Sequence, residues 1–149
     1  MKSDYPQPIV VPPGSGKELK FLGVTHKFID HQTNGAFYLF EFEFDPESGN
    51  RLHVHSYEDE IVYVLEGAVE IRLDNQKLQT GAGGIANLPK KIPHSLYNPL
   101  KTRSRYLALA IPGGMERFFD DLSAAKENST LDDVTHRKIS RKYGIEWLE

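Results

Sequence analysis

The middle of the chain, residues 36–112, is a succession of short segments that have the residue pattern of β-strands. Each segment is rich in β-branched or aromatic residues or alternates between apolar and polar positions, and Gly, Pro or Asn separates it from the next. Short strands with frequent turns are typical of an antiparallel sandwich or barrel, so we predict a mainly β fold. The strand patterns cover residues 36–44, 53–55, 60–65, 68–73, 77–78, 85–88 and 106–111.

The aromatic residues of the first strand pattern lie at every second position. Tyr38, Phe40, Phe42 and Phe44 therefore share one face of the predicted strand, with glutamates between them on the other face. In a closed barrel the interior face forms the core and also lines any cavity. Phe40 and Phe42 are therefore candidate substrate contacts as well as core residues.

Four side chains of the kinds that bind transition metals occur in this region: His53, His55, Glu60 and His94. His53 and His55 are two residues apart, so both imidazoles point to the same face of an extended strand. Glu60 opens the next strand after a short polar bend. Three imidazoles and one carboxylate suit a divalent transition metal whose coordination sphere is partly open. Glu58 is the alternative carboxylate ligand, although we expect it to be a solvated residue of the bend.

The spacing of these residues resembles the two sequence motifs of the cupin superfamily. The matching stretches are His53-x-His55-x4-Glu60-x6-Gly67 and Gly83-x5-Pro89-x4-His94-x3-Asn98. The resemblance implies a cupin-type double-stranded β-helix, which is a jelly-roll barrel, and it implies that the histidines and Glu60 are the metal ligands. Two glycines of the usual motifs are replaced here, one by Glu47 and one by Lys91. Neither replacement removes a ligand.

The β pattern ends at Pro112-Gly113-Gly114, and the residues beyond it have helical periodicity. One helix is predicted to pack on the outside of the barrel through an apolar stripe, and Thr130 with Asp133 predicts the capped start of a second helix that ends near Gly144. The apolar stripe consists of Met115, Phe118, Phe119 and Leu122.

With 149 residues the chain has the size of one domain. We divide it into an N-terminal arm (residues 1–18), a cupin β-barrel (19–112) and a C-terminal helical extension (113–149) that belongs to the same domain. The arm lacks an apolar run long enough for a signal peptide, so we expect a cytoplasmic protein. The formal charge of −3 gives no basic field for nucleic acid or an anionic membrane. The absence of cysteine excludes disulfides, iron–sulfur clusters and thiol nucleophiles.

Among cupins, the chain is similar to small single-domain proteins of the quercetin 2,3-dioxygenase-like group. The similarity lies in residues 111–119, where Pro-Gly-Gly precedes an aromatic helix, and in residues 143–146. It implies a dioxygenase that cleaves an enolisable aromatic or diketone small molecule, with Glu60 as a ligand or as a general base. The family also implies a homodimer. The cofactor would be one divalent ion of Fe, Mn, Ni, Co, Cu or Zn per chain, because imidazole and carboxylate accept all of these.

Two other functions stay open at this point. One is a redox-free, metal-dependent isomerase or lyase acting on a sugar or small acid, with Arg51, Lys90 and Lys91 as candidate anchors for an acidic group. The other is a cupin that binds a small molecule without turning it over. Asn98 shares strand parity with His94 and is either a site residue or a turn residue before Pro99.

The remaining histidines, His26, His31 and His136, lack the spacing of metal ligands. We expect all three to lie at the surface.

Overall fold

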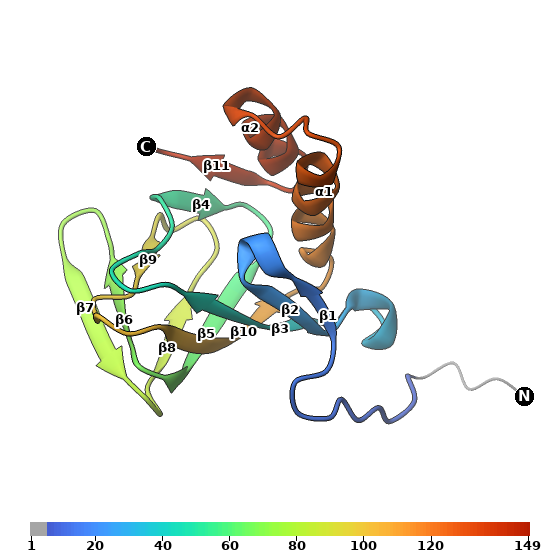
Figure 1. Ribbon diagram of the computed structural model, residues 1–149, viewed down its shortest axis with the longest axis horizontal. Helices are drawn as coiled ribbons and strands as arrows, with labels where there is room; N and C mark the ends of the chain where they lie inside the picture. Colours follow the sequence, from blue (N-terminus) through green and yellow to red (C-terminus); the bar gives the residue numbers. More distant parts are fainter. Residues whose placement is uncertain (1–5) are drawn as a thin grey trace, which may run out of the picture.

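The computed structural model describes residues 6–149 and has the mainly β, jelly-roll architecture that the sequence predicts (Figure 1). Two α-helices and a last short strand follow the barrel. The strands are β1 (Lys17–Leu19), β2 (Val24–Phe28), β3 (Tyr38–Phe44), β4 (His53–His55), β5 (Asp59–Glu66), β6 (Ala68–Arg72), β7 (Lys77–Gly81), β8 (Ile85–Leu88), β9 (Ser95–Tyr97), β10 (Ser104–Ile111) and β11 (Ile145–Trp147). The helices are α1 (Glu116–Glu127) and α2 (Asp133–Lys142).

The strands form antiparallel sheets that enclose one core. The largest sheet has the order β1-β2-β3-β10-β5-β8, a second has the order β7-β6-β9, and β4 pairs with β11. Strands that are distant in sequence become neighbours, because β10 lies between β3 and β5. Strand β5, which carries Glu60 near its start, lies between β10 and the edge strand β8.

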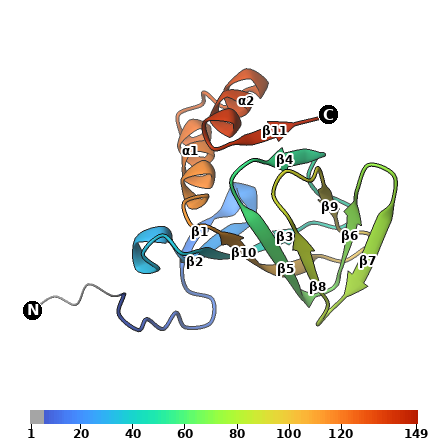
Figure 2. The same cartoon turned by 180° about the vertical axis from the view of Figure 1, so that it is seen from behind.

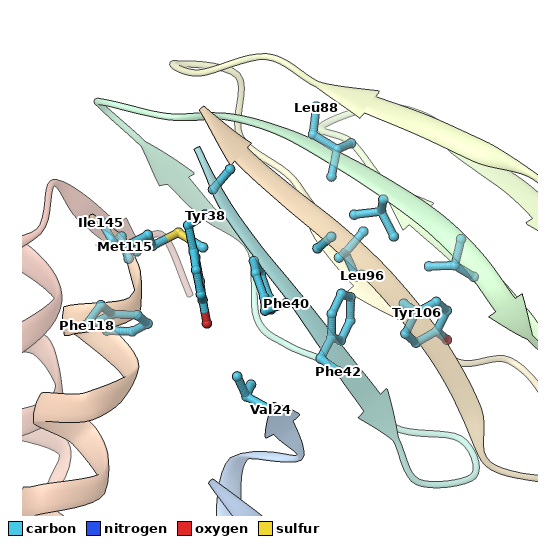
Figure 3. Close-up of a cluster of buried hydrophobic side chains, with 14 of the residues drawn as sticks. Val24, Tyr38, Phe40, Phe42, Leu88, Leu96, Tyr106, Met115, Phe118 and Ile145 are labelled. Atoms are coloured by element: carbon cyan, nitrogen blue, oxygen red, sulfur yellow. The ribbon is translucent and has the colours of Figure 1, made fainter. Parts of the chain in front are cut away.

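The aromatic face of β3 is buried, as its alternation predicts (Figure 3). Tyr38, Phe40 and Phe42 are at most 8% exposed, and the ring of Tyr38 stacks on that of Phe40 with centroids 4.4 Å apart. Glu41, between them, points outward and accepts a hydrogen bond from Arg105 of β10. Each buried aromatic side chain contributes about 1.5–3 kcal/mol to stability. The alternation therefore fixes which face of β3 lines the interior.

Ser104 joins two residues of the sequence motifs at one end of the barrel. Gly67 has a φ of +86°, and a Cβ atom there would lie 2.1 Å from the Ser104 Oγ atom. That hydroxyl accepts a hydrogen bond from the Ala68 backbone N–H and donates one to Asn98 Oδ1 (2.8 Å). The Asn98 amide nitrogen donates to the carbonyls of Asp45 (3.1 Å) and Thr102 (2.9 Å). Asn98 is fully buried in this network, which corrects its candidacy as a substrate residue.

The two helices and β11 lie together at one end of the barrel (Figures 1 and 2). The predicted apolar stripe of α1 is buried at Phe118 and Leu122. The predicted capping box at Thr130 is wrong: α2 begins after Asp132, whose side chain accepts the Thr135 N–H at 2.7 Å. Asp132 is placed better because a carboxylate one residue before the helix reaches its free N–H groups.

Strand β11 was not predicted from the sequence. It pairs with β4, so that Ile145 lies opposite His55 and Trp147 opposite His53. The last strand of the chain therefore pairs with the strand that carries His53 and His55.

His26 is buried, which corrects the expectation of a surface position. Its Nδ1 atom lies 2.5 Å from the Tyr38 hydroxyl and its Nε2 atom 3.0 Å from Asp120 of α1. The imidazole thus ties α1 to β2 and β3. His31 is exposed, as expected.

Of the predicted N-terminal arm, residues 1–5 lie outside the described residues. Residues 6–16 contain no helix or strand, and β1 begins at Lys17. None of the helices formed by residues 6–149 has the length and apolar character needed to cross a membrane.

Candidate metal centre

Strand β4 and the residue before β9 bring the three motif histidines together. His53 and His55 are both buried on the inner face of β4. The backbone of His94 forms an antiparallel bridge with that of His53, through N–H to carbonyl hydrogen bonds of 3.0 and 2.9 Å. One potential ligand atom from each of the three imidazoles lies within 4.8 Å of the others. The three histidines therefore form a group that could hold one metal ion.

Backbone carbonyls fix the orientation of two imidazoles. His53 Nδ1 lies 2.7 Å from the Arg51 carbonyl, and His94 Nδ1 lies 3.3 Å from the Ile92 carbonyl. A carbonyl only accepts, so each Nδ1 is the protonated nitrogen and each Nε2 keeps a free lone pair. This is the tautomer that metal-binding histidines with a backbone partner adopt.

Unpartnered polar atoms gather at this site. Within residues 6–149, four buried side-chain polar atoms lack a hydrogen-bond partner: His55 Nδ1, Glu58 Oε2, His94 Nε2 and His136 Nδ1. Buried polar groups are normally satisfied, and each one left unpaired costs about 1–3 kcal/mol. His94 Nε2 lies where a ligand nitrogen should lie, so the donor set fits a divalent cation.

Glu60 comes from β5 and faces the imidazoles. Its Oε2 atom lies 3.6 Å from His94 Nε2 and 3.8 Å from His55 Nε2. Burial alone would raise the pKa of Glu60, but the imidazoles around it outweigh burial and lower that pKa. Burial and the neighbouring imidazoles lower the pKa of His53 to about 3. At neutral pH the site therefore presents an ionised carboxylate and a neutral His53.

Glu58 is buried beside His55, which corrects the expectation of a solvated bend residue. Its Oε2 atom lies 3.6 Å from His55 Nδ1, too far for a hydrogen bond but close enough for strong attraction. Burial lowers the pKa of His55, but the Glu58 and Glu60 carboxylates outweigh it, and the pKa of His55 is raised. Glu58 and Glu60 are two residues apart, so extending the alternation of β5 back by one residue would have placed Glu58 on the same face as Glu60.

We expect the Glu58→Gln variant to bind metal about 10- to 100-fold more weakly than the wild type. The change removes the negative charge that attracts the Nδ1 side of His55 while keeping the shape of the side chain. Competition with a chelator of known affinity measures the effect. Glu127→Gln, at an exposed position on α1, is the control. Equal affinity in Glu58→Gln and wild type would leave His55 oriented by packing alone.

A cavity of about 190 Å³ extends from the metal site toward the helices. Phe40, Phe42 and Phe44 of β3 line one wall, and Phe118 and Phe119 of α1 line another. Phe40 and Phe42 thus line the cavity, and their contact with a substrate stays a prediction. No lysine or arginine is among the lining residues that the structure describes.

Arg51 lies outside this cavity, which corrects its candidacy as a substrate anchor. Its guanidinium lies 3.8 Å from Asp133 and 5.6 Å from the centre of the Trp147 ring, and Arg51 is not among the lining residues. Lys90 and Lys91 are exposed in the loop before His94 and do not line the cavity either. Arg51 stands two residues before His53, a spacing that would put both side chains on one face of an extended strand, but β4 begins only at His53 and does not direct Arg51 inward.

Two cavity residues were missed by the sequence reasoning. Trp147 of β11 lies against the His53 ring with centroids 4.8 Å apart, and His136 of α2 lies 5.3 Å from the Trp147 ring. His136 was expected at the surface, but it is half-buried. The only local signal was the aromatic content of the tail, which does not show where the tail packs.

Residues 40–110 match the sequence profile of the cupin domain. The chain is 27% identical over 91 residues to quercetin 2,3-dioxygenase from Bacillus subtilis, a match that covers 61% of this chain and 27% of that protein. The chain thus spans less than half the length of the curated relatives it matches.

Solved structures with the same fold include proteins of different described activities. One is a predicted oxalate decarboxylase from Thermotoga maritima (TM-score 0.55, 26% identity, 60% of this chain and 78% of that one). Another is the polyketide cyclase RemF from Streptomyces resistomycificus (TM-score 0.51, 32% identity, 60% and 65%). The motifs, the barrel and the converging histidines identify residues 40–110 as a cupin domain.

Proposed function

We propose that this cupin is a metal-dependent dioxygenase that acts on a small enolisable aromatic or diketone molecule. The observation that carries the proposal is the convergence of three imidazoles and an ionised carboxylate, of which His53, His55 and Glu60 line a cavity with aromatic walls. A divalent transition ion held there would act as a Lewis acid that favours the enolate form of the substrate. The similarity to quercetin 2,3-dioxygenase supports this choice of chemistry.

In this proposal metal binding, proton transfer and substrate positioning fall to different residues. His53, His55 and His94 would hold the ion through Nε2. Glu60 Oε2, ionised and beside two of these nitrogens, is placed to bind the same ion or to take the proton of an enol. The phenylalanine walls exclude water and hold a planar substrate in one orientation.

The size and charge of the cavity narrow the substrate class. Its volume of about 190 Å³ is below the 300–1,000 Å³ of clefts for drug-sized ligands, so a compound of one or two rings fits better than a larger one. The described lining has no lysine or arginine, so apart from the metal ion itself nothing there compensates a carboxylate or phosphate on the part of the substrate remote from the metal. We therefore favour neutral diketones and hydroxylated aromatics.

The direct test is oxygen uptake by metal-loaded protein with a panel of such compounds. Uptake should require both the metal and the substrate, and both atoms of ¹⁸O₂ should enter the cleaved product. Protein loaded in turn with each of the six candidate ions identifies the active one. Metal-replete protein that consumes no oxygen with any member of the panel would refute the dioxygenase.

A second candidate is a redox-free lyase or cyclase that uses the same site. It is supported by the identity of 32% to the polyketide cyclase RemF and by the position of Glu60, which can move a proton without any oxidant. Turnover of the same panel under strict anaerobiosis would favour this function. A redox-free isomerase or lyase that acts on a sugar or small acid is less well supported. Its candidate residues for binding an acidic group, Arg51, Lys90 and Lys91, lie outside the cavity.

Replacing Glu60 by glutamine should lower turnover by about 10²-fold or more while the three imidazoles still hold metal. Glutamine has the shape of glutamate but neither its charge nor its basicity. Steady-state kinetics and metal content are measured on the same preparation, with Glu66→Gln, an exposed position on the same strand, as the control. Wild-type turnover in Glu60→Gln would remove Glu60 from the mechanism.

Assembly as a homodimer and a cytoplasmic location stay predictions. The N-terminal arm exposes the side chains of Ile9 and Val10, at 42% and 87%.

A further inference from the structure

The C-terminal extension supplies the cavity wall that lies opposite the barrel interior. The cupin domain match ends at residue 110, yet α1 contributes Phe118 and Phe119, α2 contributes His136, and β11 contributes Ile145 and Trp147. The barrel therefore carries the metal ligands, while residues beyond it shape the space next to them. We therefore expect the residues beyond the barrel to determine which substrates bind.

His136 is the one ionisable side chain in the described lining outside the metal cluster. Its Nδ1 atom is buried and has no hydrogen-bond partner among residues 6–149. An unpaired nitrogen of this kind costs about as much as a lost hydrogen bond, so a ligand that supplies the missing partner gains that free energy on binding. Burial, reinforced by the Arg51 guanidinium, lowers the pKa of His136, so its imidazole is neutral at neutral pH.

The position of His136 is set by contacts on both sides. Its backbone N–H donates to the Asp132 carbonyl (2.9 Å) in the first turn of α2, and its own carbonyl accepts the Ser140 hydroxyl (2.7 Å). The same hydroxyl accepts the Trp147 indole N–H (2.8 Å). His136 and Trp147 are therefore held as one unit.

The Trp147 ring contacts the imidazoles of both His53 and His136. It is 4.8 Å from the ring of His53 and 5.3 Å from that of His136, centre to centre. His53, Trp147 and His136 line the same cavity, so a planar ligand bound at the metal ligands can extend along the Trp147 ring toward His136.

We propose that His136 is a specificity residue, which binds a neutral hydroxyl or keto oxygen at the end of the substrate remote from the metal. The proposal rests on the function proposed for the site, and it adds the second polar group that the substrate must carry. A neutral imidazole has one donor and one acceptor nitrogen, so it pairs with a hydroxyl without requiring a charge on the ligand.

Two probes isolate this contact: 1-phenyl-1,3-butanedione and its 4-hydroxyphenyl analogue. Both present the same diketone to the metal, and only the second places a hydroxyl beyond the ring. Binding to zinc-loaded, tag-free protein is measured by quenching of Trp147, the only tryptophan of the chain. The wild type should bind the hydroxylated probe about tenfold more tightly, the equivalent of one hydrogen bond.

The His136→Phe variant keeps an aromatic ring in the wall and removes both nitrogens. We expect its preference between the two probes to fall to about one, while its zinc content stays that of the wild type. His136→Gln, which restores a polar side chain, should recover part of the preference. Lys138→Ala, an exposed position on α2, is the matched control.

An undiminished preference in His136→Phe would overturn the proposal, and so would a wild type that binds neither probe or binds both equally. Zinc is redox-inactive, so this measurement is independent of oxygen chemistry. Lost preference in His136→Phe together with no oxygen uptake in metal-replete wild type would refute the dioxygenase and leave the role of His136 standing.

Discussion

The His94→Ala variant is expected to bind a divalent transition metal more than about 100-fold more weakly than the wild type and to have no metal-dependent turnover. Changes to groups that only support a ligand already cost 10- to 100-fold in affinity, so loss of a ligand itself must cost more. His94 Nε2 is buried 3.6 Å from Glu60 Oε2 and has no hydrogen-bond partner among the described residues. Calorimetric titration of metal-stripped protein and elemental analysis measure the effect.

The fold of this variant should persist. The bridge between residues 53 and 94 consists of backbone hydrogen bonds, which alanine keeps. His94→Gln, which fills more of the space, separates loss of a ligand from loss of packing. His31→Ala, at an exposed histidine, is the control for histidine content. Unchanged metal affinity in both His94 variants would mean that the three-histidine group is not the binding site.

The second large effect is expected at Asn98, on stability instead of activity. Asn98→Ala should lower the free energy of unfolding by about 3–5 kcal/mol, because it removes several buried hydrogen bonds and leaves their partners unpaired. The side chain holds the Asp45 and Thr102 carbonyls, the Leu100 N–H and the Ser104 hydroxyl. Urea unfolding measures the loss.

Asn87→Ala, an exposed asparagine on β8, is the control and should change stability little. The metal affinity of the folded Asn98→Ala protein should equal that of the wild type, because its contacts lie in the turns around Ser104. If Asn98→Ala were as stable as the control but bound ligand more weakly, Asn98 would be a substrate-binding residue and not a structural one.

The parts of this protein that follow from local pattern could be predicted from the sequence. The alternation of Tyr38, Phe40 and Phe42 predicts which face of β3 is buried, and the two-residue step between His53 and His55 predicts that their imidazoles share a face. His94 joins them only through a backbone bridge to a residue 41 positions earlier, which local pattern cannot show. The resemblance to the cupin motifs supplied that information.

The parts that depend on long-range packing could not be predicted. Strand β11 has three residues, too few for a recognisable alternation, and its place beside β4 is set by the helices before it. The roles of Trp147 and His136 depend on that placement. Asn98 has the parity of a site residue, but the polar groups of the surrounding turns take up its amide. The position of a residue in a strand predicts the face to which its side chain points, whereas the tertiary fold decides which groups that side chain contacts.

The central claim, that His53, His55 and His94 together hold one ion beside a carboxylate, is tested most directly by X-ray absorption spectroscopy of the tag-free protein loaded with one equivalent of zinc. The account predicts three imidazole nitrogens at about 2.0–2.1 Å from the ion and at least one oxygen at about 2.0–2.2 Å, with one imidazole fewer in His94→Gln. A spectrum that is the same in both proteins, or that shows no imidazole bound to the ion, would contradict it.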